Sequence, residues 1–349
     1  MIRSFRLPDT PLVSQLQASG EHLDLRRALL WSRSSLSAAM LVYLPFSRRG
    51  VRTLVMRENV SGAPSAGFLQ YHERRGQPEA DVIFCAPAIG GNKNGKNNQH
   101  IWHKLLNYLV VRLGERGCQR LYARLVDGAP ELEVFWQLGF SAYARTRIYQ
   151  REGLPPLPEP AKSPLWRLQT ARDVWSVGQL YAAVTPKLVQ QAENLPQSDY
   201  RTPYRDDFGR SIDRRYVWVE KDEVSASLRV IRGHHRCWLK LIVNPQSLEQ
   251  ADDLLRDALR FVPSQSEKIY VSVREYQSEL EGAILRGGFT HLTTEMLMVK
   301  HTTVMVKKPV LKQIPAIEGI EARPTGTYVS APADGLSGKT YAISHNRRS

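Results

Sequence analysis

The sequence has little cysteine and no long apolar run. Its three cysteines, Cys85, Cys118 and Cys237, lie far apart and lack the spacing of a metal or redox motif, so we expect reduced thiols in a cytoplasmic protein. The most apolar run, residues 36–46, is shorter than the roughly 20 residues that a membrane-spanning helix needs. Residues 1–6 carry positive charge with no apolar stretch behind them, which is not typical of a signal peptide. We therefore expect no disulfide framework and no membrane partner.

The sequence also has fewer acidic than basic residues. The chain has 48 Lys+Arg against 34 Asp+Glu, a formal net charge of +14, and most of the excess lies in residues 1–150. A basic domain favours anionic partners, which include phosphorylated cofactors and nucleic acids. Four arginine pairs could contact nucleic acid, but no helix-turn-helix, zinc-finger or RNA-binding motif accompanies them, so we expect them on solvated faces. These pairs are Arg26-Arg27, Arg48-Arg49, Arg74-Arg75 and Arg214-Arg215.

A length of 349 residues predicts two domains, because single hydrophobic cores rarely grow past about 250–300 residues. Residues 152–163 are rich in proline, which indicates a stiff linker. From residue 309 onward the apolar residues lose their periodicity while Pro and Gly recur, which predicts a flexible tail over 309–349. The predicted domains are residues 1–151 and 164–308.

The two predicted domains carry the same series of elements. Each has several strands, a long helix with a leucine pair, another strand, a short helix that ends in Gly-Phe, and a last strand. The leucine pairs and the Gly-Phe pairs are offset by the same number of residues. They are Leu105-Leu106 with Leu254-Leu255, and Gly139-Phe140 with Gly288-Phe289. We interpret the series as a duplicated domain.

Apolar runs and alternating patterns predict five strands in each half. They cover residues 51–57, 66–72, 80–86, 120–125 and 142–149, and then 216–220, 224–231, 237–243, 268–273 and 293–300. Several strands follow one another without a helix, which excludes a strictly alternating parallel sheet. The predicted fold class is α/β (α+β), with two domains in tandem, each a mixed, mostly antiparallel sheet flanked by helices.

This order of elements resembles the GNAT superfamily of acyl-CoA-dependent N-acetyltransferases. The resemblance covers about residues 1–150 and again 164–305. It implies acetyl-CoA as co-substrate, with its pyrophosphate on a Gln/Arg-x-x-Gly-x-Gly/Ala loop at the start of the long helix, where free N–H groups and the helix dipole favour anions. In the first copy, Asn92 takes the Gln/Arg position, Gly95 the first glycine and Asn97 the last.

Only Gly95 matches that pattern strictly, although asparagine also tolerates positive φ and lysine adds positive charge. The residues that the resemblance implies for cofactor binding are Asn92, Lys93, Asn94, Gly95, Lys96, Asn97 and Asn98. The alternative interpretation of this segment is a solvated turn. In the second copy the corresponding residues 244–253 contain three carboxylates and no glycine, so we expect no CoA there.

The resemblance also implies a proton donor for the thiolate and a base for the amine. Phe135 and Ile284 stand where many family members have a donor Tyr, which leaves water or Cys85 as the donor. The candidate bases are Asp81 and Glu79, at the start of the strand that leads to the loop, and strict alternation places Asp81 on one face with Cys85. The alternative is a set of solvated strand-edge charges. Backbone N–H groups at residues 85–88 would polarise the thioester carbonyl.

Two function classes follow. The first is an N-acyltransferase that transfers an acetyl group from acetyl-CoA to a primary amine of a small molecule or protein, with the first copy active and the second structural. The alternative is a GNAT-like pseudoenzyme that binds RNA or a protein. No metal is expected, because His100 and His103 share a helix face without the three or four converging ligands that zinc requires.

Overall fold

The computed structural model describes residues 1–30, 35, 39, 51–60, 63–74, 76–90, 95–153, 165–200 and 212–302. These fall within one compact unit, Met1–Met305. The linker residues 154–164 and the tail from residue 303 lie outside the described residues. Within the described ranges, no helix is both long and apolar enough to cross a bilayer.

The first series of elements runs to Glu152. It comprises β1 (Ile2–Ser4), α1 (Thr10–Leu16), β2 (Glu21–His22), α2 (Leu25–Leu30), β3 (Arg52–Val60), β4 (Ala63–Glu73), β5 (Glu79–Ala86), α4 (Gly95–Glu115), β6 (Arg120–Val126), α5 (Glu131–Gln137) and β7 (Ser141–Glu152). The predicted strands and the long helix of this half are all present.

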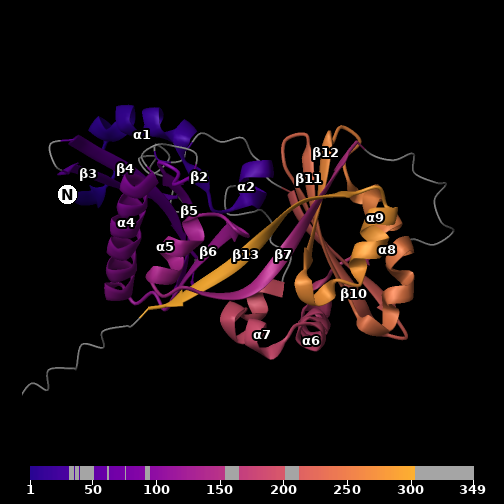
Figure 1. The fold of residues 1–349 in the computed structure, drawn as a ribbon. Coiled ribbons are helices and arrows are strands. Elements are labelled where there is room, and N and C mark those ends of the chain that lie inside the picture. The colour runs from indigo at the N-terminus through magenta and orange to yellow at the C-terminus, as the bar shows by residue number, and fades with distance from the viewer. Residues whose placement is uncertain are drawn as a thin grey trace, which may run out of the picture. The chain divides into compact units, whose positions relative to one another are not determined.

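Among the described residues, the second series follows the same order with two differences: no strand lies between its two leading helices, and the helix with the leucine pair has eight residues where a long helix was predicted. It comprises β8 (Arg167–Leu168), α6 (Val174–Val184), α7 (Lys187–Glu193), β9 (Ile212–Glu220), β10 (Glu223–Arg232), β11 (Arg236–Val243), α8 (Ala251–Ala258), β12 (Lys268–Arg274), α9 (Leu280–Arg286) and β13 (Thr290–His301). The predicted fold class is confirmed: both halves combine a mixed, mostly antiparallel sheet with flanking helices (Figure 1).

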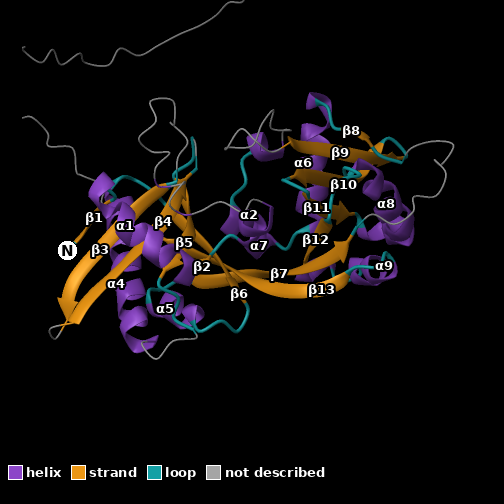
Figure 2. Ribbon diagram, turned by 90° about the horizontal axis from the view of Figure 1, so that it is seen from above, coloured by secondary structure: helices purple, strands orange, loops and turns teal. Residues whose placement is uncertain are grey.

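The two halves share one continuous sheet, because each gives its last strand to the other. The strand order is β1-β3-β4-β5-β6-β13-β7-β12-β11-β10-β9-β8. β13 pairs with β6 from His301↔Arg120 to Glu295↔Val126, and β7 pairs with β12 from Lys268 onward. The long strands β7 and β13 lie side by side where the halves meet (Figures 1 and 2). The sequence predicted two sheets and gave no sign of this exchange.

The Gly-Phe pairs end equivalent helices in the two halves. Gly139 has φ +77° and Gly288 has φ +78°, a left-handed conformation that glycine adopts without a Cβ clash. The amide N–H of Phe140 donates to the carbonyl of Phe135 at 3.0 Å, and that of Phe289 donates to the carbonyl of Ile284 at 3.3 Å. Both phenylalanine rings are buried in the cores beneath these helices. The repeated pair is thus a helix stop with an apolar anchor.

One face of the sheet is covered by α4 and α5 in the first half and by α8 and α9 in the second, over two apolar cores. The opposite face is covered by short elements: α1 in the first half, α2 and α7 nearer the middle, and α6 over β10 and β11 in the second half (Figures 1 and 2). These short elements cover the sheet incompletely, and the space they leave holds the candidate site.

Candidate functional site

A cavity of about 480 Å³ lies on this second face and is lined by both halves. Its walls are strongly charged. The cationic side chains in its lining are Arg26, Arg27, Arg74, Arg124, Arg215, Arg229, Lys240 and Arg274. The acidic ones are Asp24, Asp81, Glu193, Asp199, Asp213 and Glu295. Cations exceed carboxylates by two, and this volume is typical of small-molecule sites.

The cavity corrects one expectation from the sequence. Arg26, Arg27, Arg74 and Arg215 belong to arginine pairs that we expected on solvated faces, yet all four line the cavity. The reason is the sheet itself: β9 turns Arg215 to the inner face, and α2 holds its arginines over the middle of the sheet. A local charge pattern does not reveal which side of a strand is covered.

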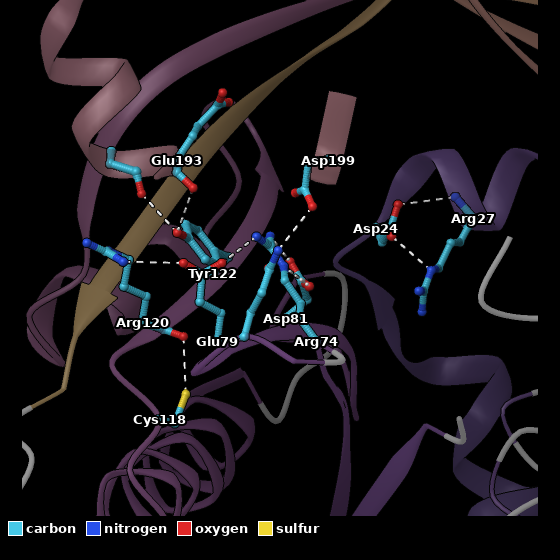
Figure 3. Close-up of polar contacts among 12 residues, drawn as sticks. Asp24, Arg27, Arg74, Glu79, Asp81, Cys118, Arg120, Tyr122, Glu193 and Asp199 are labelled. Atoms are coloured by element: carbon cyan, nitrogen blue, oxygen red, sulfur yellow. Dashed lines mark hydrogen bonds and ion pairs between the residues drawn. The ribbon is translucent and has the colours of Figure 1, made fainter. Parts of the chain in front are cut away.

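Arg74 organises the end of the cavity in the first half (Figure 3). Its guanidinium donates to both carboxylate oxygens of Asp81 at 2.8 Å and to Glu79 at 2.8 Å. It also lies 4.2 Å from the ring centre of Tyr122, a cation–π contact. Arg120 donates to the other oxygen of Glu79 at 3.3 Å. This network fixes both candidate bases in place.

The arginine keeps Asp81 ionised. Burial raises the pKa of Asp81, but the charge and hydrogen bonds of Arg74 outweigh it and hold the pKa well below its usual range. A carboxylate with a lowered pKa and both oxygens engaged is a weak proton acceptor. Asp81 and Glu79 are therefore brought together by the fold, chiefly as partners of Arg74.

Cys85 lies elsewhere. The pairing of β4 with β5 shifts register between Gln70↔Phe84 and Tyr71↔Val82, which leaves Ile83 as a β-bulge. A bulge turns the following side chains to the other face, so Cys85 is buried in the core beneath α4 while Asp81 faces the cavity. The expectation that the two share a face is wrong for this reason. Burial also raises the pKa of the Cys85 thiol well above its usual value.

The edge of β5 is partly occupied by the amino-terminal segment. β6 pairs with β5 only at Glu79, Ala80 and Asp81. Beyond that point β2 takes its place, with Glu21 opposite Cys85, and the N–H of Ala88 donates to the carbonyl of Ser19 at 2.6 Å. The chain itself thus contacts the backbone at 85–88, which the GNAT resemblance assigns to the thioester.

The candidate phosphate loop is described in part. Asn92, Lys93 and Asn94 lie outside the described residues, and Gly95 and Lys96 are the first two residues of α4. Asn97 is exposed, whereas Asn98 is buried and donates its amide to the carbonyl of Ala88 at 2.7 Å.

A carboxylate already lies at the start of this loop. Glu131, at the beginning of α5, accepts from the N–H groups of Ile89 at 3.1 Å and Gly90 at 3.4 Å. Phe135, in the position of the family's donor tyrosine, is fully buried against Trp102 and Phe140. In the described part of the first copy, a carboxylate of the chain itself therefore lies at the start of the candidate phosphate loop. The position of the donor tyrosine has no hydroxyl.

One further residue of the cavity was not singled out from the sequence. Glu295 of β13 is buried and makes no ion pair within 4 Å among the described residues. Burial raises its pKa, against the nearby charge of Arg124. Because β13 crosses into the first half, no sequence signal could have placed Glu295 near Asp24 and Arg124. Among the described residues, no three His, Cys, Asp or Glu side chains converge as a metal site.

The sequence matches no protein-family model and no curated protein. Among solved structures, the chain is similar to a GCN5-related N-acetyltransferase from Sphaerobacter thermophilus, with 12% identity over 86% of this chain and 95% of that one, at a TM-score of 0.47. It is similar to a tandem GNAT protein from the clavulanic acid biosynthesis pathway, with 12% identity, 86% and 98% coverage, and a TM-score of 0.47.

A functionally unknown conserved protein from Staphylococcus epidermidis is also similar, with 12% identity, 67% and 91% coverage, and a TM-score of 0.49.

Proposed function

We propose that this protein is an N-acyltransferase that transfers an acetyl group from acetyl-CoA to a primary amine held in the central cavity. One observation carries the proposal: Asp81 and Tyr122, which line the cavity, are the last residues at which β5 and β6 pair. The resemblance puts the thioester at the end of β5. An amine held at Asp81 and Tyr122 would therefore lie on the same strand as the carbonyl that it attacks, four to seven residues before it.

Glu295 is the best-placed base in this proposal. Attack requires a neutral amine, and a carboxylate accepts its proton most effectively when its pKa is raised toward the working pH. The pKa of Glu295 is raised and that of Asp81 is lowered. Tyr122 has a pKa raised chiefly by burial, so it stays protonated and keeps its hydroxyl on the carbonyls of Ala192 and Glu193. Its role is to shape the cavity wall.

In the proposal, acetyl-CoA is held by the residues from Asn92 to Asn98, with the first copy active and the second copy structural. The chemistry that acetyl-CoA supplies is an activated carbonyl with a thiolate leaving group. The residues of this chain orient the amine, remove its proton and exclude water. Two features of the structure oppose the donor half of this proposal, namely the pairing of β2 with the edge of β5 and the contact of Glu131 with Ile89 and Gly90.

Those two features favour a second candidate, a binding protein that has lost acyl transfer. Its ligand would occupy the same cavity. A volume of about 480 Å³ suits a small molecule better than the RNA or protein partner expected from the sequence. The two candidates share the cavity and differ in whether acetyl-CoA binds.

The test is a thermal-shift titration with acetyl-CoA, followed by a CoA-release assay over a panel of primary amines. The proposal expects a saturable rise in Tm and turnover that falls at least 100-fold in Glu295→Gln. Glu133→Gln is the matched control, because Glu133 is an exposed carboxylate on α5, and its turnover should equal that of wild type. Absence of both CoA binding and turnover would refute acyl transfer and leave the binding protein.

A further inference from the structure

Three neighbouring strands bring three cations into one row on the floor of the cavity. Arg215 of β9 lies directly across from Arg229 of β10, and Arg229 lies directly across from Lys240 of β11. Side chains directly opposite each other in a sheet have Cβ atoms about 4.5–5.5 Å apart, and like charges in such positions destabilise the pairing. All three side chains line the cavity.

The carboxylates nearby neutralise only one of these three cations, Arg229. Asp213 is bound to Arg229, with its Oδ1 3.0 Å from Nε and its Oδ2 2.5 Å from a terminal nitrogen. Glu193 is bound to Arg274 and to the hydroxyl of Tyr181. Across the described ranges, neither the Arg215 nor the Lys240 side chain makes a hydrogen bond or ion pair, and Nε of Arg215 is buried without a partner.

A fourth cation approaches from above. Arg26 belongs to α2, which packs on β11, and its Nε is likewise buried without a hydrogen-bond partner among the described residues. Burial lowers the pKa of Arg26 to about 10; the nearby Asp24 opposes this shift, whereas Arg124 and Arg229 add to it. Positive charge therefore faces the cavity from two sides, from the row on the sheet and from Arg26 on α2.

Burial and repulsion among these cations lower the pKa values of two members of the row. Burial, with Arg274 and Arg229 nearby, lowers the pKa of Lys240 to about 7. Burial, with Arg229 next to it, lowers the pKa of Arg215 to about 10. Buried charges without partners are unfavourable. A bound anion in the cavity would remove the repulsion and supply the missing acceptors.

We propose that Arg215, Arg229 and Lys240, with Arg26 opposite them, bind the phosphate group of a small-molecule ligand. A phosphate offers three acceptor oxygens and about two negative charges, and arginine is suited to it through its planar fork of donors. In the proposed acyltransferase this makes the acceptor a phosphorylated amine, a statement that rests on the proposed function. Phosphate binding itself requires only the cavity.

The experiment is a calorimetric titration and a thermal-shift assay at pH 7 and constant ionic strength, with potassium chloride as the salt control. The probes are inorganic phosphate, O-phosphoethanolamine and ethanolamine. We expect saturable binding and a rise in Tm with both phosphate compounds and none with ethanolamine. Tighter binding of O-phosphoethanolamine than of inorganic phosphate identifies a phosphate ester as the ligand, whereas equal affinities identify free phosphate.

Lys240→Met and Arg215→Met test the site. Each removes one like charge from the row, so we expect a higher Tm without ligand together with at least a tenfold weaker Kd for the phosphate probes. A residue with only a structural role would lower the Tm instead. Lys268→Met is the matched control, since Lys268 lies on the adjacent strand β12 and outside the cavity lining, and it should bind phosphate like wild type.

A second measurement needs no variant. Inorganic phosphate should protect Lys240 of the wild-type chain from acetylation by an N-hydroxysuccinimide ester, measured by mass spectrometry, while Lys268 is modified equally with and without phosphate. Unchanged Kd in both cavity variants, or no protection of Lys240, would overturn the proposal. These measurements do not depend on acyl transfer, so a failure of the proposed function leaves them interpretable.

Discussion

Arg74 and Asp81 form a two-point ion pair, with two N–H···O distances of 2.8 Å, at the boundary between the cavity and the β5–β6 junction. The side chains are 24% and 26% exposed, so the pair is largely removed from water. Its geometry is the planar, bidentate one in which arginine binds a carboxylate most strongly. Because Arg74 donates only once to Glu79, loss of the Asp81 carboxylate would leave a partly buried guanidinium with one of its three side-chain hydrogen bonds.

Asp81→Asn should lower the free energy of unfolding by about 2–3 kcal/mol, because one partner of a largely buried pair is lost. Urea denaturation at pH 7 measures this. Glu152→Gln serves as the control, since Glu152 faces Lys268 at 3.6 Å with 79% of its side chain exposed, and an exposed pair contributes about 1 kcal/mol or less. If both variants lost the same free energy of unfolding, the Arg74–Asp81 pair would contribute no more than an exposed pair, which would contradict the prediction.

The stabilisation by the Arg74–Asp81 pair depends on pH. The pKa of Asp81 is lowered in the folded state, so its stabilisation is fully present above the unfolded value of about 4 and declines as the pH falls below it. The difference between wild type and Asp81→Asn should therefore shrink between about pH 4 and pH 2. A difference that stays constant over this pH range would show that the carboxylate charge is not the source of the stabilisation.

Lys240→Met should stabilise the ligand-free protein, by an amount that depends on pH. The folded pKa is about 7 against an unfolded value of about 10.4. Charging Lys240 lowers the free energy of unfolding. This loss has its full size below pH 7, becomes smaller as the pH rises, and is absent above the unfolded pKa. The groups that interact with it are Arg274, Arg229 and Arg124, which repel it, and Glu193, which attracts it.

We therefore expect a gain on the order of 2–4 kcal/mol at pH 6 and almost none at pH 10, measured by denaturant unfolding at both pH values. Lys268→Met, which changes the same charge outside the cavity, should show no such trend. A loss of stability at pH 6 would mean that the ammonium group has a partner that stabilises it.

The strand exchange predicts that the two halves stay together after the chain is cut between them. A protease site introduced within residues 154–164 would separate the series without touching β7 or β13. Because each fragment lends a strand to the other's sheet, the cut protein should elute as one species in size-exclusion chromatography and separate only in denaturant. Two peaks under native conditions would be inconsistent with the exchange.

Deletion of residues 312–349 should leave the unit Met1–Met305 folded, because this segment has repeated Pro and Gly and no periodic apolar face. We expect the Tm to change by less than about 2 °C, measured by differential scanning calorimetry. A fall of many degrees would show that the segment packs as part of the core.

Features with a local signal could be predicted from the sequence. The strands, the long helix and the Gly-Phe helix ends follow from periodicity and from the need for positive φ at Gly139 and Gly288. The common order of elements then gave the fold class. These features depend on residues close together in the chain.

Features set by distant residues could not be predicted. The bulge at Ile83 depends on how β4 pairs with β5, and it decides that Asp81 and Cys85 face opposite sides. The row Arg215–Arg229–Lys240 depends on the registers of two strand pairs, and Glu295 reaches the cavity only because β13 crosses between the halves. Composition reported the surplus of cations but not the face on which they gather.

The exchanged strands also bear on how the protein is made. The edge of β6 that β13 covers cannot be paired until the ribosome has synthesised the chain to His301. At typical translation rates this leaves a strand edge exposed for roughly 10–30 s after β6 itself is complete. An open edge is a template for pairing with other chains, so during this interval the nascent protein presents an edge to which a strand of a neighbouring chain can add.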